Sequence, residues 1–315
     1  MIIALEEHYF DPSWNQSFDD RRHAARGPSP LFTMLEELGE RRIADMDRAG
    51  IDVQVLSHAP PGAQGLRDDC AVGWSEAAND ALAFAVAAYP TRFAGFASLP
   101  TADPAAAARE LERAVLQLGF KGGMIHSLGE GPFLDEKRYW PIFECAAALN
   151  VPLYLHPADP NPAVVEAYYK TYSKTHPIIM RAAWGFAFET GTQAVRLVLS
   201  GMFERYPTLK IILGHMGETI PFQLARIDAS FAREKTVPNF RDLFTRHFYV
   251  TTSGFFSDAA LRCCISELGV HRVLFSVDWP YVTNEDGVRF INRAPLSPEE
   301  RARVTADNAR ELLGL

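Results

Sequence analysis

Short runs of apolar residues alternate with amphipathic stretches along the whole chain. Apolar runs of strand length occupy eight segments: 2–8, 52–60, 92–100, 122–127, 152–157, 210–217, 248–254 and 272–280. Most of them are continuous rather than alternating, which is typical of parallel strands covered on both faces. The stretches between them, such as ERRIADMDRAG (40–50) and AAAARELERAVLQLG (105–119), have helical periodicity and end at a glycine.

Eight strand and helix units in 315 residues predict an α/β fold, a single-domain (β/α)8 TIM barrel spanning residues 1–315. A doubly wound open sheet is the alternative. Two connections are longer than a barrel needs: residues 9–33 after the first predicted strand and 158–190 after the fifth. Both follow carboxyl ends of strands, where barrel enzymes carry their active sites, so we expect lids or subunit contacts there.

Composition and charge narrow the classes of partner. The chain is 48% hydrophobic and has no apolar run of membrane-spanning length, which predicts a soluble protein. Its 31 basic and 39 acidic residues give a net charge of -8, so nucleic acid and anionic membranes are not expected partners and a small molecule is. The N-terminus has no signal-peptide pattern, and the cysteines form no CxxC pair: Cys70, Cys145, Cys263 and Cys264. We therefore expect a cytoplasmic protein without disulfides.

Several predicted strands end in side chains that can bind a metal, namely Glu6, His8, His156, His215 and Asp278. Because side chains alternate along a strand, Glu6 and His8 share one face. At the mouth of a barrel that face is the lumen, where they would meet His156 and Asp278. Buried carboxylates are unfavourable unless neutralised, and this mixture of nitrogen and oxygen ligands suits one divalent cation such as Zn²⁺ or Mn²⁺.

Each of these groups also has a purely structural interpretation. His58 and His126 end strands too, and the sequence leaves open whether they contact a substrate. In HMGE, His215 and Glu218 are compatible with a cap on the following helix. Lys121 precedes a predicted strand rather than ending one, so a bridging carbamylated lysine of a two-metal site is not expected.

The motifs ALEEH, LYLHP, ILGHMGE, FSVDWPY and DNARELLGL, in this order, resemble the decarboxylase branch of the amidohydrolase superfamily. This branch contains the relatives of aminocarboxymuconate semialdehyde decarboxylase, and the γ-resorcylate and 2,3-dihydroxybenzoate decarboxylases are the most similar. The resemblance covers nearly the full chain and implies a homodimer or homotetramer. It implies metal ligands at Glu6, His8, His156 and Asp278, a catalytic pair of His215 and Glu218, and substrate contacts from Arg226 and Tyr281.

The resemblance also implies release of CO₂ from a hydroxybenzoate-like or muconate-like acid. Glu6 stands where superfamily hydrolases carry a histidine, so the ligand set contains two carboxylates. The extra negative charge should leave a metal-bound water less acidic, which favours decarboxylation over the alternative, hydrolysis of a lactone or amide. A metal-binding scaffold without catalysis is the third interpretation. Ala158 and Tyr281 depart from common residues of the branch, so the substrate itself stays open.

We expect His215 to take or hold the phenolic proton of such a substrate, with Glu218 orienting the imidazole. Asp278 is then the expected proton donor to the ring carbon that bears the carboxylate. The source of the proton on Asp278 is not apparent from the sequence.

Overall fold

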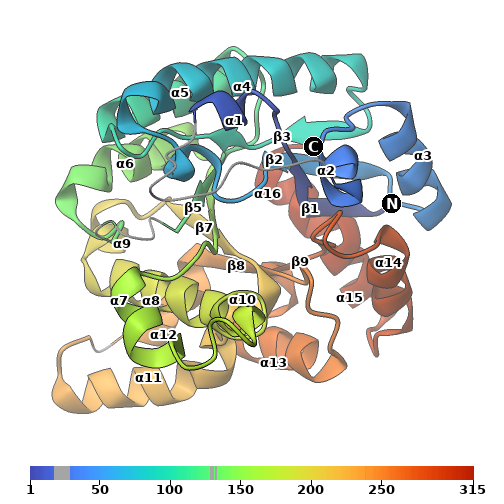
Figure 1. Ribbon diagram of the computed structural model, residues 1–315. Coiled ribbons are helices and arrows are strands. Elements are labelled where there is room, and N and C mark those ends of the chain that lie inside the picture. Colours follow the sequence, from blue (N-terminus) through green and yellow to red (C-terminus); the bar gives the residue numbers. More distant parts are fainter. Residues whose placement is uncertain (18–28, 128–130, 132, 238) are drawn as a thin grey trace.

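The computed structural model describes residues 1–17, 29–127, 131, 133–237 and 239–315. Parallel strands lie at its centre, and helices surround them (Figure 1). Within the described residues the strands are β1 (Ile3–Tyr9), β2 (Val53–His58), β3 (Phe93–Gly95), β4 (Ala97–Ser98), β5 (Gly123–His126), β6 (Pro152–His156), β7 (Lys210–Leu213), β8 (Phe248–Thr251) and β9 (Val273–Leu274). Each of the eight predicted segments thus contains a strand, although every strand after β1 is shorter than predicted.

Helices follow the strands in the predicted alternation. The described α-helices are α1 (Trp14–Ser17), α2 (Pro30–Leu35), α3 (Glu40–Ala49), α4 (Asp68–Ala88), α5 (Pro104–Leu116), α6 (Trp140–Leu149), α7 (Pro162–Val164), α8 (Gly185–Leu199), α9 (Met202–Arg205), α10 (His215–Glu218), α11 (Ile220–Glu234), α12 (Phe240–His247), α13 (Asp258–Leu268), α14 (Asn284–Arg293), α15 (Pro298–Ala302) and α16 (Asn308–Leu313). Single capping residues set the starts and ends of these helices. Asp103 accepts hydrogen bonds from the first-turn N–H groups of α5, and Gly50 ends α3 at a φ of 83°.

The strands form a closed (β/α)8 barrel. Two runs of parallel neighbours, β1-β2-β3 and β4 to β9, are joined because β3 and β4 are halves of one extended segment separated at Phe96. The barrel closes between its last and first strands, where the N–H of His8 donates to the carbonyl of Trp279 at 2.8 Å and the N–H of Glu6 to Ser276 Oγ at 2.7 Å. The expected barrel is confirmed, and the open-sheet alternative is wrong.

Two apolar layers hold the barrel together. The inner layer contains lumen-facing side chains such as Leu5, Val55 and Ile212, with α16 packed against them. The outer layer lies between the strands and the surrounding helices and contains side chains such as Leu56 and Leu213. Because apolar side chains fill the lumen, the polar groups at the carboxyl ends of the strands lie directly above a layer of tightly packed apolar side chains.

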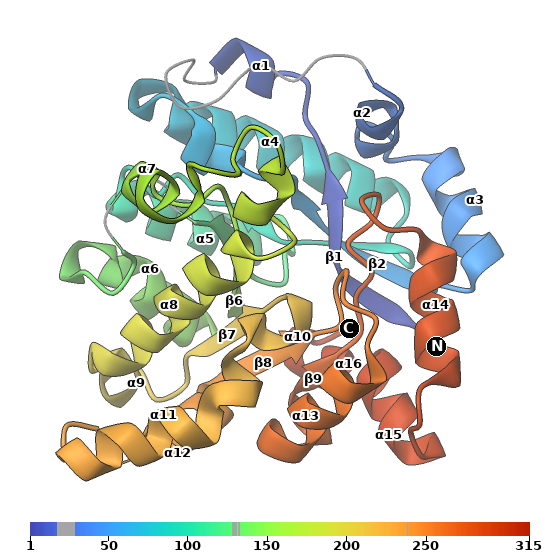
Figure 2. The same cartoon turned by 60° about the horizontal axis from the view of Figure 1, so that its bottom comes forward.

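Both expected long connections are present. The connection after β1 contains α1 and α2, and its residues 18–28 lie outside the described residues. The connection after β6 contains α7 and two further short helical segments, Val165–Tyr169 and Pro177–Met180, and it ends earlier than predicted because α8 begins at Gly185. Figure 2 shows α1, α2 and α7 toward the same end of the barrel. Among the described helices, none is long and apolar enough to cross a membrane.

Candidate metal centre and active site

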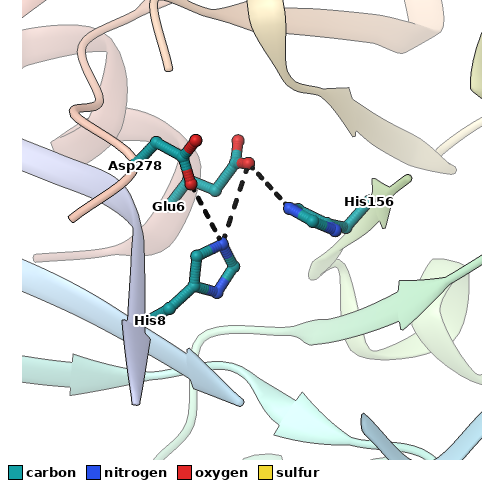
Figure 3. Close-up of side chains that lie close together, drawn as sticks. All are labelled: Glu6, His8, His156 and Asp278. Carbon is teal, nitrogen blue, oxygen red and sulfur yellow. Dashed lines mark ion pairs between the residues drawn. The ribbon is translucent and has the colours of Figure 1, made fainter. Parts of the chain in front are cut away.

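Four side chains from three parts of the chain meet at the carboxyl end of the barrel. Glu6 and His8 come from β1, His156 ends β6, and Asp278 follows β9 (Figure 3). Each offers one ligand atom, and these atoms all lie within 4.8 Å of one another. Glu6 Oε1 is 3.1 Å from His156 Nε2, and His8 Nε2 is 3.4 Å from Asp278 Oδ1. The four residues predicted to meet are therefore brought together.

A bulge in β1 aims these side chains. The pairing of β1 with β2 shifts between Ala4 and Glu7, so β1 has one residue more than its partner there. Leu5 packs in the inner layer and Tyr9 in the outer one, which strict alternation would not allow. The bulge resets the alternation, so Glu6 and His8 point into the lumen above Leu5.

The donor atoms in this cluster fit a cation. Glu6 Oε1 and His8 Nε2 are buried and have no hydrogen-bond partner among the described residues. Buried polar atoms without partners are rare in folded proteins, and a carboxylate oxygen facing an imidazole nitrogen suits a divalent ion. Burial raises the pKa of Glu6, but the nearby His215, His156 and His8 outweigh it and hold that pKa below its usual value. The carboxylate is thus ready to bind a metal.

Hydrogen bonds to the remote nitrogen orient His156. Its Nδ1 is 2.7 Å from the carbonyl oxygen of Pro157 and 3.0 Å from Nδ1 of His126. A carbonyl can only accept, so Nδ1 of His156 carries the hydrogen and Nε2 presents its lone pair to Glu6. His126 in turn lies with Nε2 3.0 Å from the carbonyl of His58, and burial together with His156 lowers its pKa well below the usual value. A neutral His126 therefore supports the imidazole of His156.

The Glu7 carboxylate, on the opposite face of β1, holds the segment that carries Asp278. It accepts hydrogen bonds from the N–H groups of Val277 at 2.9 Å and Trp279 at 3.2 Å. Burial raises the pKa of Glu7 to about 8, against the lowering effect of these donors and of Arg42. Asp278 itself has a φ of 77°, a left-handed conformation that is strained for a residue with a Cβ. Contacts such as those of Glu7 keep it there.

His215 and Glu218 lie in a left-handed turn. The φ angles from His215 to Thr219 are 48°, 58°, 76°, 52° and 69°, so α10 has the opposite hand to the helix after it. Each such residue other than Gly217 costs about 1–2 kcal/mol. Gly217 also packs closely, since a Cβ there would lie 2.7 Å from Val250 Cγ1. A run of strained residues points to a functional constraint on this turn.

The turn joins His215 and Glu218 and points the imidazole at the metal cluster. His215 Nδ1 is 2.7 Å from Glu218 Oε1, and its Nε2 lies 3.6 Å from Glu6 Oε1 and 3.9 Å from Asp278 Oδ2. Burial lowers the pKa of His215, but Glu218 and Glu6 outweigh it and raise that pKa well above the usual value. Thr219, the N-cap residue of α11, makes no side-chain capping hydrogen bond, and Glu218 contacts His215 instead.

A cavity of about 290 Å³ opens above the cluster, a size typical of small-ligand sites. Most of its wall is apolar, and its charged groups belong to the metal cluster, to His215 and to the pair Asp159 and Arg181. Its lining residues are Pro60, Pro61, His156, Pro157, Ala158, Asp159, Ile178, Arg181, Ala182, Phe186, His215, Asp278 and Tyr281. An apolar slot with a cation site at one end suits a flat ring that carries a carboxylate.

A family model with the description amidohydrolase matches residues 8–315 of the chain. The chain belongs to the amidohydrolase family. It is 38% identical to γ-resorcylate decarboxylase from Polaromonas sp. strain JS666, over 99% of this chain and 98% of that protein.

Solved structures of similar proteins share the fold. Dihydroxybenzoic acid decarboxylase from Polaromonas sp. JS666, with bound manganese and the inhibitor 2-nitroresorcinol, superimposes with a TM-score of 0.90 at 38% identity, covering 100% of this chain and 97% of that one. The 5-carboxyvanillate decarboxylase from Sphingomonas paucimobilis gives a TM-score of 0.90 at 35% identity, with 100% and 99% coverage. The resemblance to decarboxylases of this superfamily is confirmed.

The two predicted substrate contacts of this amidohydrolase differ in placement. Tyr281 lines the cavity, with its ring 5.7 Å from that of His8. Arg226 lies on the exposed side of α11 and is not among the described residues that line the cavity of its own chain. The helical pattern around Arg226 was compatible with an exposed position, so its contact with substrate stays a prediction.

Neither His58 nor His126 is a lining residue of the described cavity. His58 accepts a hydrogen bond from the N–H of Asp11 at 3.1 Å, and its Nδ1 donates to the carbonyl of Ala59 at 2.8 Å; both of these contacts are structural. The sequence did not indicate Asp159, Arg181 or Tyr154 as site residues. For Tyr154 a signal existed: it lies two residues before His156 on one strand and therefore on the same face.

Tyr154 fixes the second oxygen of Glu6. Its hydroxyl donates a hydrogen bond to Glu6 Oε2 and lies 3.0 Å from Thr251 Oγ1. Oε2 is thereby occupied, and Oε1 is left to face the metal cluster. Glu6 of this amidohydrolase thus turns one carboxylate oxygen, Oε1, toward the other three side chains of the cluster.

Replacing Tyr154 by Phe should weaken metal binding by about 10–100-fold, because the partner that orients Glu6 is lost while the ring still fills the lumen. Titration of the metal-free variant with Mn²⁺ measures this. Tyr9→Phe is the matched control, since it removes a buried hydroxyl that faces the carbonyl of Ala78 instead. Equal metal affinity of wild type and Tyr154→Phe would contradict the role of Tyr154.

Proposed function

We propose that this amidohydrolase is a metal-dependent, nonoxidative decarboxylase of a hydroxylated aromatic carboxylic acid. The observation that carries the proposal is the junction of a four-ligand metal cluster with the His215–Glu218 pair at one end of an apolar cavity. Full-length similarity to decarboxylases of dihydroxybenzoate and 5-carboxyvanillate supports it. None of these named relatives is a hydrolase, so hydrolysis gains no support from them.

Glu6, His8, His156 and Asp278 would hold one divalent ion. When bound, the ion supplies positive charge that attracts the substrate carboxylate and an adjacent hydroxyl oxygen. The manganese of the Polaromonas structure favours Mn²⁺, while Zn²⁺ fits the same ligand types. The apolar lining, which includes Pro60, Pro61 and Phe186, would keep water away from the ring.

His215 would act on the substrate hydroxyl. Its Nδ1 is held by Glu218, so Nε2 is the nitrogen that faces the cluster. A bound divalent ion would lower the raised pKa of His215, so that the neutral imidazole can take the phenolic proton through Nε2. Removing that proton raises electron density at the ring carbon that bears the carboxylate. This carbon then needs a proton before its bond to the carboxylate breaks.

Asp278 would donate that proton. Its Oδ2 lies 3.9 Å from Nε2 of His215, so a shift of about 1 Å brings the two groups into hydrogen-bond distance. A proton taken from the phenol by His215 can pass to Asp278 and on to the ring carbon. The electron pair of the broken bond stays with the ring, CO₂ leaves, and the phenolate of the product regains its proton from solvent.

A product assay tests the proposed function. The Mn²⁺-loaded protein is incubated with a panel of hydroxybenzoates, lactones and aryl amides, and CO₂ and ring products are quantified by gas analysis and NMR. We expect one CO₂ and one phenol per hydroxybenzoate consumed. Ring opening or amide cleavage without CO₂ release would contradict the proposal.

We further propose one domain over residues 1–315, a homodimer or homotetramer, and a cytoplasmic location. The insertion 158–190 supports the subunit contact, because large apolar side chains are exposed along it: Tyr168, Tyr172, Ile178, Trp184 and Phe188. Sedimentation velocity measures the assembly state.

A further inference from the structure

An arginine and an aspartate form a forked ion pair at the half-exposed rim of the cavity. Asp159 follows β6, and Arg181 comes after the short helical segment Pro177–Met180 in the same connection. Arg181 Nε lies 2.7 Å from Asp159 Oδ1, and Nη2 lies 2.9 Å from Oδ2. Both side chains are half-exposed and both line the cavity together with His215 and Asp278.

The fork fixes how the pair faces a ligand. Nε and Nη2 of Arg181 are committed to Asp159, and no group among the described residues accepts a hydrogen bond from Nη1. Each carboxylate oxygen of Asp159 keeps a lone pair beyond the one that Arg181 uses. The hydrogen bonds from Arg181 to Asp159 and the nearby Tyr281 raise the pKa of Arg181, so it stays charged. The rim therefore offers unused N–H donors beside carboxylate acceptors, with no net charge.

Tyr281 links this rim to the metal cluster. Its ring contacts that of His8 edge-on at 5.7 Å, and it lines the same cavity as Arg181. A ring whose carboxylate and adjacent hydroxyl face the metal ligands would therefore extend its far edge toward Arg181 and Asp159. The ortho positions stay at the metal end.

We propose that Arg181 and Asp159 receive a further hydroxyl group on the far edge of the substrate ring, beyond the ortho positions. A hydroxyl donates to Asp159 and accepts from Nη1 of Arg181, so it satisfies both members of the pair. A second carboxylate would face the carboxylate of Asp159, and an unsubstituted edge would leave both groups unused. This inference rests on the proposed function and names the substrate class: benzoates with one hydroxyl beside the carboxylate and another remote from it.

Selectivity ratios test this inference. We compare 2,4-dihydroxybenzoate, 2-hydroxybenzoate and 4-hydroxyisophthalate with wild type and Arg181→Met. Ring reactivity differs among these acids, but it cancels when each acid is compared between two proteins. We expect Arg181→Met to lose about tenfold in kcat/KM for 2,4-dihydroxybenzoate, mainly through KM, with 2-hydroxybenzoate unchanged. Asp159→Asn should improve kcat/KM for 4-hydroxyisophthalate, because a negative charge is removed.

Arg196→Met is the matched control. Arg196 also binds an aspartate in a fork, with both contacts to Asp135 at 3.0 Å, and it does not line the described cavity. It should leave all three ratios unchanged. An equal loss for all acids in Arg181→Met would mean that the pair only holds its loop, and no loss would exclude contact with the ring; either overturns the inference. If wild type acts on none of these or other hydroxybenzoates, the proposed function itself fails.

Discussion

Replacing His215 by Asn should lower kcat by about a thousandfold while the metal stays bound. The imidazole is the group placed to move the phenolic proton, and general acid–base catalysis contributes about 10²–10⁴-fold. Asn is the suitable replacement because it tolerates the φ of 48° at this position and can still hydrogen-bond Glu218. Steady-state kinetics with a hydroxybenzoate and metal analysis of the same sample measure both effects.

A control histidine separates the chemistry of His215 from a general effect of substitution. His271 lies in the short segment Val270–Arg272 before β9, at the opposite end of the barrel. His271→Asn should retain wild-type kcat. Glu218→Gln should also lower kcat, because the negative charge beside the imidazole is lost. The decrease should be smaller than in His215→Asn, because Gln can still hydrogen-bond the imidazole. A kcat of His215→Asn within threefold of wild type would remove His215 from the reaction.

Loss of the metal should abolish activity. Chelation followed by gel filtration is expected to give an inactive protein, and added Mn²⁺ should restore turnover. His156→Ala should weaken Mn²⁺ binding by more than about a hundredfold. Loss of a residue that only orients a metal ligand costs about 10–100-fold in metal affinity, so loss of a ligand itself should cost more. Mn²⁺ titration of the metal-free proteins and activity at saturating metal check both results.

His247→Gln provides a comparison for His156→Ala. His247 is also buried, but its Nδ1 is held by the carbonyl of Leu209 on the outer side of the barrel. This variant should keep the Mn²⁺ affinity of wild type even where its thermal stability falls. Full activity of the chelated wild-type protein would rule out a required metal.

The strand pattern and the ends of the strands could be predicted from the sequence because both depend on local rules. Continuous apolar runs indicate strands that are covered on both faces. In a barrel the carboxyl ends of all strands lie at one end, so the polar groups there are expected to lie close together. This predicted the cluster of Glu6, His8, His156 and Asp278. Helix starts were also local, as the capping Asp103 illustrates.

Features that depend on neighbours in space could not be predicted. The bulge in β1 arises from its pairing with β2. The sequence pattern predicts that a strand ends and a helix starts at HMG, but His215 lies in a left-handed turn. The forked pair of Asp159 and Arg181 joins residues far apart within one long connection, for which periodicity gives no signal. The exposure of Arg226 follows from which face of α11 packs on the barrel.

The central claim is that Glu6, His8, His156 and Asp278 bind one divalent ion at the barrel mouth. Anomalous diffraction from crystals grown with Mn²⁺, recorded at the manganese absorption edge, tests it most directly. We predict one strong peak within about 2.0–2.3 Å of Glu6 Oε1, His8 Nε2, His156 Nε2 and a carboxylate oxygen of Asp278. A fully occupied ion elsewhere in the chain, with no peak between these four side chains, would contradict the account.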